Sequence, residues 1–205
     1  MMKNSVLISL LLLLVTSLNA CSQDEYKTVE EARGISVRTT VPDFNAVDQN
    51  GKTFSLKNAL TEKAVVVIFY RGQWCPICSR HLSNLQDSLS YLEEKGIQVV
   101  AVSPEKQENL KKTQEKTGAS FTLLYDEDYK ISKQFDVLFR PDDKTIKLYN
   151  ERLDANLEEA HSDNSQRLPV PATFIINQEG EVVWKHFDRD YKERASVAQI
   201  IDNLP

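Results

Sequence analysis

Two cysteines separated by two residues are the part of the sequence best suited to chemistry. Cys75 and Cys78 stand in the segment 69–78 (FYRGQWCPIC), directly after an apolar run. A thiol at the N-terminus of a helix meets free N–H groups and the positive end of the helix dipole, which favour the thiolate. The thiolate is the form that attacks disulfides and peroxides. The pair is therefore predicted to be a redox-active dithiol.

The same spacing also occurs in half of a zinc site, or in two inert buried thiols. A zinc site needs two more ligands, and the other candidates are scattered along the chain: Cys21, His81, His161 and His186. We therefore predict neither a metal nor a cofactor. A disulfide between cysteines separated by two residues closes almost no loop, so it would stabilise the fold very little. It would be a good redox couple.

The residues around the cysteines predict a strand followed by a helix. Residues 64–70 (AVVVIFY) are continuously apolar and rich in β-branched side chains, which is typical of a central strand covered on both faces. A helix is expected over about 75–95, because its leucines fall on one face and Gly96 follows as a stop. Pro76 is tolerated in the first helical turn, where it has no N–H to lose. Trp74 is expected to cover one side of the thiol pair.

The rest of the chain alternates between strand and helix patterns. Asn50-Gly51 indicates an N-terminal hairpin turn. Further strands are predicted at 97–103, 121–126, 172–177 and 181–187, with helices at 105–117, 128–135 and 192–203. This order predicts an α/β fold, with a central mixed sheet flanked by helices and right-handed crossovers in its parallel part.

Residues 140–168 interrupt the alternation and are read as a helical insertion. Ile146, Tyr149, Leu153 and Leu157 recur at helical spacing. The helix could shape the substrate side of the domain, or it could simply cover an edge of the core. We favour the second interpretation.

The N-terminus has the pattern of an export signal. Lys3 precedes an apolar run that is shorter than the roughly 20 residues of a spanning helix. The run ends in Leu-Asn-Ala-Cys21, which resembles the lipobox of bacterial lipoproteins, in which the cysteine is lipidated. A plain secretory peptide with Cys21 left as a stray thiol, or an uncleaved anchor, would explain the same residues. Lipid chains would hold the protein durably on a membrane.

Three parts of the chain are therefore expected. Residues 1–20 are predicted to be a lipoprotein signal peptide, 21–40 a flexible tether and 41–205 one domain. The protein would lie in the cell envelope, attached to a bacterial membrane through the lipid anchor only. A net charge of -5 gives no basic surface, so nucleic acid is not expected as a partner.

The thiol segment resembles the active site of the thioredoxin superfamily, in which Trp-Cys-x-x-Cys follows the central strand. The domain as a whole is similar to the alkyl hydroperoxide reductase C and thiol-specific antioxidant family, the peroxiredoxins. It resembles most a peroxiredoxin-like branch with Phe-Tyr-Arg-Gly-x-Trp-Cys-Pro-x-Cys and Leu-Pro-Val-Pro-Ala-Thr, which stand here at 69–78 and 168–173. The resemblance covers about residues 41–194. It implies a thioredoxin-like fold.

The peroxiredoxin pattern Phe-Tyr-Pro-x-x-x-Thr-x-x-Cys places the family's peroxidatic cysteine on Cys78. Its threonine falls on Cys75 and its proline on Arg71. The late arginine of the family falls on Pro171, where thioredoxins carry a cis-proline. Arg71 would then either supply the missing guanidinium from another direction or be a surface arginine at the strand end.

Pro171 precedes a strand and follows Val170, and it is predicted to form a cis peptide bond. The cis bond would turn the backbone of Val170 toward the thiols and offer its N–H and C=O to an extended substrate. A rigid trans turn is the alternative.

Two enzymatic functions and one non-enzymatic function fit these residues. The first is a peroxiredoxin-like antioxidant enzyme that reduces peroxides through a Cys75–Cys78 dithiol/disulfide cycle, reset by an external, thioredoxin-like thiol reductant. The second is a thiol–disulfide oxidoreductase acting on protein disulfides, in which Cys75 attacks and Cys78 resolves. The third is a non-catalytic binding lipoprotein, which the intact Cys-x-x-Cys disfavours.

Overall fold

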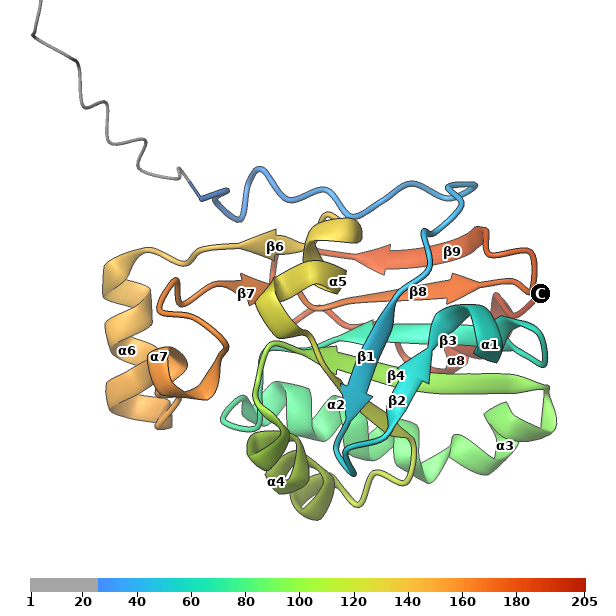
Figure 1. Ribbon diagram of the computed structural model, residues 1–205, viewed down its shortest axis with the longest axis horizontal. Helices are drawn as coiled ribbons and strands as arrows, with labels where there is room; N and C mark the ends of the chain where they lie inside the picture. Colours follow the sequence, from blue (N-terminus) through green and yellow to red (C-terminus); the bar gives the residue numbers. More distant parts are fainter. Residues whose placement is uncertain (1–25) are drawn as a thin grey trace, which may run out of the picture.

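The computed structural model describes residues 26–205, and a seven-stranded mixed sheet lies at its centre (Figure 1). Its strand order is β2-β1-β5-β4-β3-β8-β9. Strands β3, β4 and β5 run parallel, whereas β1 and β8 pair antiparallel with β5 and β3. The strands are β1 (Asn45–Asp48), β2 (Thr53–Ser55), β3 (Ala64–Phe69), β4 (Ile97–Ser103), β5 (Thr122–Tyr125), β8 (Ala172–Ile176) and β9 (Val182–Phe187).

Helices cover both faces of this sheet. Helices α2 (Pro76–Asp87), α3 (Leu89–Glu94), α4 (Gln107–Thr117) and α8 (Val197–Asp202) contribute to the core on one face. Helices α1 (Leu56–Leu60) and α5 (Lys130–Gln134), the latter preceded by the 3-10 turn η1 (Glu127–Tyr129), contribute to the core on the other. The predicted α/β class with a mixed sheet flanked by helices is confirmed.

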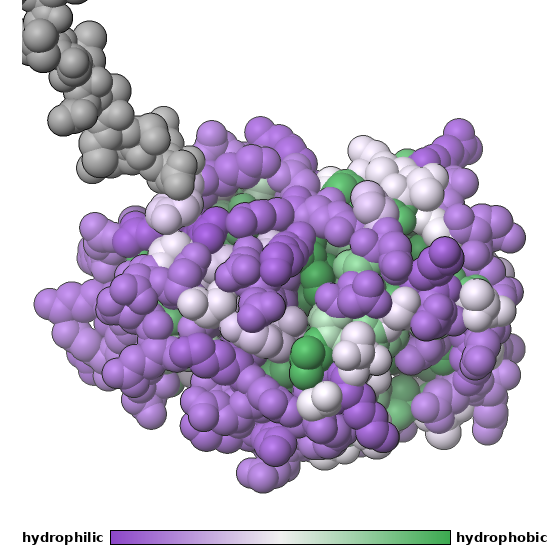
Figure 2. Space-filling model, viewed as in Figure 1, coloured by the Kyte–Doolittle hydropathy of each residue, from purple (hydrophilic) through white to green (hydrophobic). Residues whose placement is uncertain are grey.

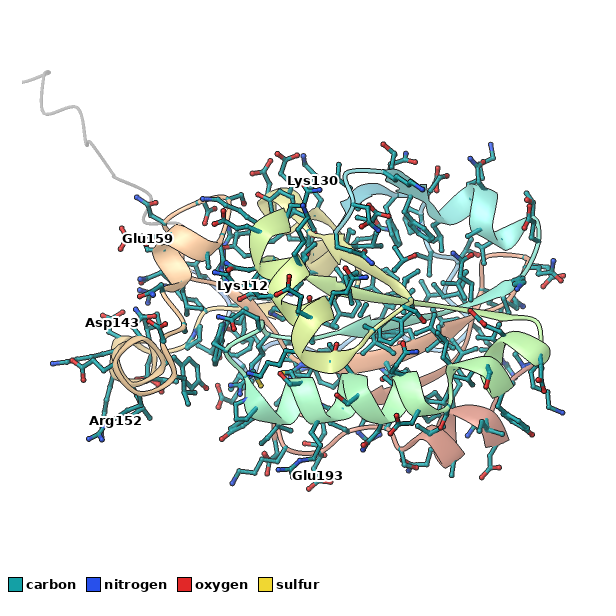
Figure 3. All side chains as sticks on the ribbon, turned by 90° about the horizontal axis from the view of Figure 1, so that it is seen from below. Lys112, Lys130, Asp143, Arg152, Glu159 and Glu193 are labelled. Carbon is teal, nitrogen blue, oxygen red and sulfur yellow. The ribbon has the colours of Figure 1, made fainter. Side chains whose placement is uncertain are left out.

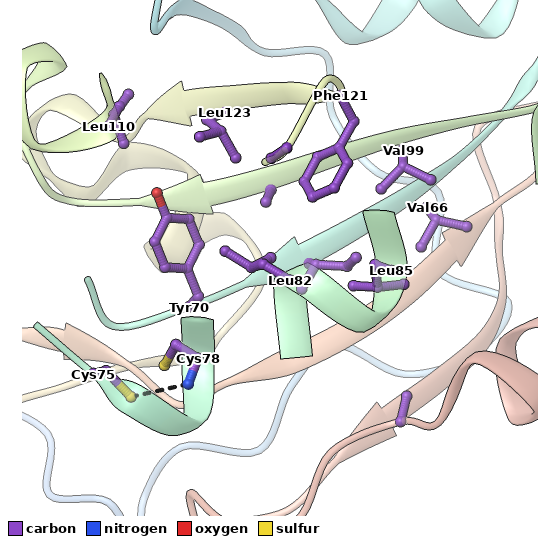
Figure 4. Packing of buried hydrophobic residues seen from close by; sticks show 14 of the residues in the cluster. Val66, Tyr70, Cys75, Cys78, Leu82, Leu85, Val99, Leu110, Phe121 and Leu123 are labelled. Carbon is purple, nitrogen blue, oxygen red and sulfur yellow. Dashed lines mark hydrogen bonds between the residues drawn. The ribbon is translucent and has the colours of Figure 1, made fainter. Parts of the chain in front are cut away.

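Strand β3 is the centre of this arrangement because both of its faces are buried. Val65 and Val67 point into the core beneath α1 and α5, and Val66 and Ile68 into the core beneath α2. Figure 4 shows Val66 of β3 and Val99 of β4 on the side of the sheet that faces Leu82 and Leu85 of α2. This packing fixes the end of β3 against the first turn of α2, where the cysteines stand.

Several predicted elements differ in detail from the structure. The single helix expected over 75–95 is divided into α2 and α3 at Ser88, whose backbone is not helical (φ -112°, ψ 7°). Serine hydrogen-bonds readily to nearby backbone groups, which weakens it as a helix-interior residue. In the tail, the capping box of Ser196 and Gln199 starts α8 later than predicted.

The insertion forms two helices, α6 (Asp143–Leu153) and α7 (Leu157–Ala160), at one end of the molecule. Figure 3 views α6 end-on, with Asp143 above the helix and Arg152 below it. The short strands β6 (Leu138–Phe139) and β7 (Leu168–Pro169), which were not predicted, pair antiparallel at the base of the insertion. They join its two ends to the domain.

Residues 26–40 were predicted to belong to a flexible tether, and this is wrong for the described part. Gly34 and Ile35 donate backbone hydrogen bonds to the carbonyls of Asp136 and Phe135, and Thr40 forms a β-bridge with Glu181. The side chain of Ala32 is fully buried. A polar segment can be held by its backbone groups as well as by apolar side chains, so its composition does not reveal that it is docked. Residues 1–25, with the predicted signal peptide and Cys21, lie outside the described residues.

The surface is largely polar. The face in Figure 2 is mainly hydrophilic, and apolar residues show near its centre, the region in which Figure 1 draws β1. Within residues 26–205, every helix is too short or too polar to span a bilayer.

Candidate active site

Cys75 begins helix α2 as its N-cap residue. Its backbone is extended (φ -86°, ψ 106°), Pro76 occupies the first turn, and the Cys75 sulfur accepts the backbone N–H of Cys78 at 3.3 Å. Figure 4 shows this contact and both sulfurs beneath Tyr70. The sequence therefore places one thiol among the free N–H groups of a helix terminus, where negative charge is stabilised.

The two thiols are free, and both are buried. Cys75 is 0% exposed and Cys78 is 1% exposed. Trp74, 4% exposed, belongs to the same buried cluster, and its role in shielding the pair stays a prediction. A molecule that reacts with these sulfurs must therefore be small, or the residues above them must move.

Arg71 supplies a guanidinium directly to the thiols. Its Nη2 donates to the Cys75 sulfur at 3.1 Å, and its Nη1 donates to the hydroxyl of Tyr149 at 2.9 Å. The residue is only 3% exposed, which rules out the alternative interpretation of Arg71 as a surface arginine. The guanidinium carbon lies 4.1 Å from the ring centroid of Tyr191, 4.9 Å from Trp74 and 5.0 Å from Tyr149.

Each thiol changes the ionisation of the other. The hydrogen bond with Cys78 and burial raise the pKa of the Cys75 thiol. Burial opposes ionisation of Cys78 too, but the hydrogen bond from Cys75 and the charges of Arg194 and Arg71 lower its pKa to about 5. Two adjacent thiolates would repel, so the pair holds one negative charge near neutral pH. Arg71 and the Cys78 amide draw this charge toward Cys75, and Arg194, 3.6 Å from the Cys78 sulfur, draws it toward Cys78.

A buried carboxyl group supports the loop before the cysteines. Glu105 is fully buried and its Oε2 accepts the N–H of Gln73 at 2.8 Å. Burial, reinforced by the charge of Cys78, raises the pKa of Glu105 to about 8. A Cβ on Gly72 would lie 2.5 Å from both Glu105 Oε1 and Trp74 Nε1, so the loop has no space for a larger residue at position 72.

A cavity of about 530 Å³ lies beside Arg71. Arg71, whose guanidinium contacts the Cys75 sulfur, lines it, but neither cysteine does. Val170, Pro171 and Tyr149 form other parts of its wall, and residues from the N-terminal segment 26–30 close one side.

The predicted cis bond before Pro171 is wrong, because every described peptide bond is trans. The Val170 N–H is already bonded to the carbonyl of Val137 at 2.7 Å, next to the β6–β7 pair. This backbone path is extended, and a trans X–Pro bond is favoured by about 0.5–1 kcal/mol in the absence of other constraints. The Val170 N–H is therefore not available to an extended substrate.

The AhpC/TSA family model matches residues 37–185. The chain belongs to this family.

Curated AhpC/TSA relatives with sequence similarity are named peroxiredoxins. The peroxiredoxin Bcp of Escherichia coli is 34% identical over 96 residues, which are 47% of this chain and 61% of that protein. The chain thus spans about three fifths of the length of that relative. A chloroplastic peroxiredoxin Q of Triticum aestivum is 32% identical over 172 residues, 83% of this chain and 68% of that protein.

Solved structures show the same fold. Peroxidoxin BcpB from Mycobacterium tuberculosis superposes with a TM-score of 0.64 at 21% identity, covering 83% of this chain and 94% of that chain. A putative thiol:disulfide interchange protein DsbE from Chlorobium tepidum gives 0.52 at 24% identity, covering 83% and 99%. The predicted thioredoxin-like fold is confirmed, and it is shared by proteins named for both kinds of thiol chemistry.

Four residues of this AhpC/TSA site were missed by the sequence analysis: Glu105, Tyr149, Tyr191 and Arg194. Glu105 follows the carboxyl end of β4, where α/β proteins gather functional groups, and this position could have indicated it. Tyr149 was recognised only as one of the apolar residues of the insertion helix. The insertion both covers the core, through Ile146 and Leu157, and reaches the site, so the favoured interpretation was incomplete.

We predict that Gly72→Ala destabilises the protein by about 1–3 kcal/mol and slows reaction of the thiols. The new Cβ would meet Glu105 and Trp74, and the backbone at φ +156° strongly favours glycine. Urea unfolding and the rate of thiol modification measure the two effects. Gly118→Ala is the control, because its φ of +71° carries strain but nothing lies within 4 Å. Equal losses in both variants would contradict the role of the loop contact.

We also predict that one thiol ionises near pH 5, far below the ordinary thiol value of about 8.5. The thiolate is then present above pH 5 and is lost as the pH falls through that value. Ultraviolet absorbance of the thiolate in the reduced protein measures this. The unfolded protein should titrate near the ordinary value, and a native transition near pH 8 without one near pH 5 would refute the prediction.

Proposed function

We propose that this chain is a thiol peroxidase of the peroxiredoxin type, cycling between the Cys75–Cys78 dithiol and its disulfide. The observation that carries the proposal is the burial of two free thiols, one of them in contact with a guanidinium. Such a site admits a molecule the size of a peroxide after a small movement of Arg71. A protein disulfide would need an exposed sulfur, which neither cysteine offers.

The first step forms a sulfenic acid on Cys78, the position of the family's peroxidatic cysteine. The Cys78 thiolate attacks the outer oxygen of the peroxide, the O–O bond breaks, and the departing alkoxide takes the proton of the Cys75 thiol to leave as an alcohol. The raised pKa of Cys75 supports this assignment, because Cys75 still carries its proton when Cys78 attacks.

The second step forms the disulfide. The Cys75 thiolate attacks the sulfenic sulfur, the S–S bond forms, and hydroxide leaves and becomes water with a proton from solvent. An external dithiol of the thioredoxin type then reduces the disulfide and is itself oxidised. The net reaction converts a peroxide and a dithiol into an alcohol, water and a disulfide.

A thiol–disulfide oxidoreductase is the second candidate, and one observation favours it. The Cys75 sulfur receives both the Arg71 guanidinium and the Cys78 amide. These contacts favour attack by Cys75, as expected for a Trp-Cys-x-x-Cys enzyme acting on protein disulfides.

We further propose that the protein is exported and held in the cell envelope by lipid on Cys21. The support is the apolar N-terminal run and its lipobox-like ending. The Lys27 carbonyl accepts the N–H of Arg140, so a membrane anchor on Cys21 would lie only a few residues from a point held against the domain. No nucleic-acid partner is proposed.

Cysteine variants separate the two enzymatic functions. For a peroxidase, Cys78→Ser should abolish peroxide consumption with a dithiol donor, whereas Cys75→Ser should retain the first turnover and stop at the sulfenic acid. For the second candidate, Cys75→Ser should abolish insulin reduction, and the wild type should show little peroxide turnover. If neither substitution changes any activity, both proposals fail.

Lipidation is tested by mass spectrometry of the full-length protein expressed in a bacterium that processes lipoproteins. We expect the mature chain to begin at Cys21 with acyl chains attached and to fractionate with membranes. Cys21→Ser should release it. A mature chain with unmodified Cys21 would overturn the anchor.

A further inference from the structure

Arg71 is a buried cation without a carboxylate counterion. Within residues 26–205, the ion pairs between side chains involve other residues, and the two side-chain acceptors of its guanidinium are the Cys75 sulfur and the Tyr149 hydroxyl. Burying an unpaired charge is strongly unfavourable. The single negative charge of the Cys75–Cys78 pair is therefore the countercharge of Arg71, and the strength of this pairing depends on where the guanidinium is held.

The geometry points to Tyr149 as a positioning residue that holds Arg71 against the Cys75 sulfur of the thiol pair, so that the helical insertion contributes a residue to the active site. This inference rests on the proposed thiol chemistry, although it does not depend on whether the substrate is a peroxide or a disulfide. It assigns to the insertion a function beyond covering the core.

Without a residue that holds it, the Arg71 side chain could move away from the Cys75 sulfur. Its side chain is long and flexible, and it lines a cavity of about 530 Å³ in which the guanidinium could be hydrated. Tyr149 opposes this movement through the hydrogen bond from Nη1 and through its ring, 5.0 Å from the guanidinium carbon. Trp74 and Tyr191 add rings around the same cation.

The insertion fixes Tyr149 in turn. Asp142 caps α6 by accepting the N–H and hydroxyl of Thr145, and Ile146 anchors the helix in the core. The ring of Tyr149 packs against Trp74 with centroids 5.0 Å apart. A purely structural role would need only this ring. The hydroxyl is the part that the inference requires.

Tyr149→Phe is therefore the test, because it keeps the ring and removes the acceptor for Arg71. We expect the pKa of the first thiol to rise by about half a unit to one unit, since the guanidinium is held less firmly beside the sulfurs. At a pH below the wild-type pKa, the thiols of the variant should react with a small alkylating reagent about three- to tenfold more slowly than those of the wild type. The melting temperature should stay close to the wild-type value.

Two further variants make the result specific. In an Arg71→Met background, Tyr149→Phe should change the thiol pKa no further, because the two residues act through one contact. Tyr91→Phe, at a 44% exposed tyrosine of α3, is the matched control and should leave the titration unchanged.

The other groups that face the thiols stay constant in this comparison. They are Arg194 from the segment before α8, Glu105 from the loop before α4, and Tyr70 at the end of β3. An unchanged pKa in Tyr149→Phe, or an equal shift without Arg71, would overturn the inference. Thiolate titration needs no peroxide, so failure of the peroxidase proposal would appear separately, as absent turnover with a shifted pKa.

Discussion

The contact between a buried guanidinium and a sulfur is the interaction on which this site depends. Arg71 and the thiolate would each be unfavourable alone in the interior, and together they compensate for much of the cost of leaving water. The helix N-terminus adds an N–H donor to the same sulfur, and the loop carrying Arg71 is held by Glu105 through Gln73. The fold is therefore built around the ionised, reduced form of the pair, since that form alone completes the charge balance around Arg71.

The guanidinium beside the sulfurs comes from a different position of the chain than in the peroxiredoxin pattern that this sequence resembles. In that pattern an arginine stands at the position of Pro171 and a proline at the position of Arg71. Here the guanidinium enters from the end of β3, on the same loop as the cysteines, and Pro171 forms part of an extended, trans wall of the cavity. This change of position keeps a positive charge beside the sulfur in a chain that also carries the Trp-Cys-x-x-Cys segment of thioredoxins.

Local patterns allowed the sequence to predict the centre of the fold. The apolar run of β3, the proline in the first turn of α2 and the spacing of the cysteines are all encoded within a few residues of one another. The partners of Arg71 are not. Tyr149 lies 78 residues further along the chain, and Arg194 reaches Cys78 across 116 residues. Such contacts depend on how the insertion and the C-terminal segment fold back, which periodicity does not describe. The docked segment 26–40 was missed because backbone hydrogen bonds hold it, and these leave little trace in composition.

The charge balance also bears on the direction of electron flow. Contacts that stabilise the reduced thiolate more than the disulfide make the disulfide easier to reduce, because the reduction potential follows the relative stability of the two forms. The same contacts lower the intrinsic nucleophilicity of the sulfur, since nucleophilicity falls with pKa. A peroxidase can tolerate the lower nucleophilicity in return for a disulfide that is easier to reduce. The weak O–O bond is a reactive target, whereas the disulfide that forms in a buried pocket must be recycled by an external thiol. In the proposed cycle the disulfide form leaves Arg71 without this countercharge, and reduction restores the pairing.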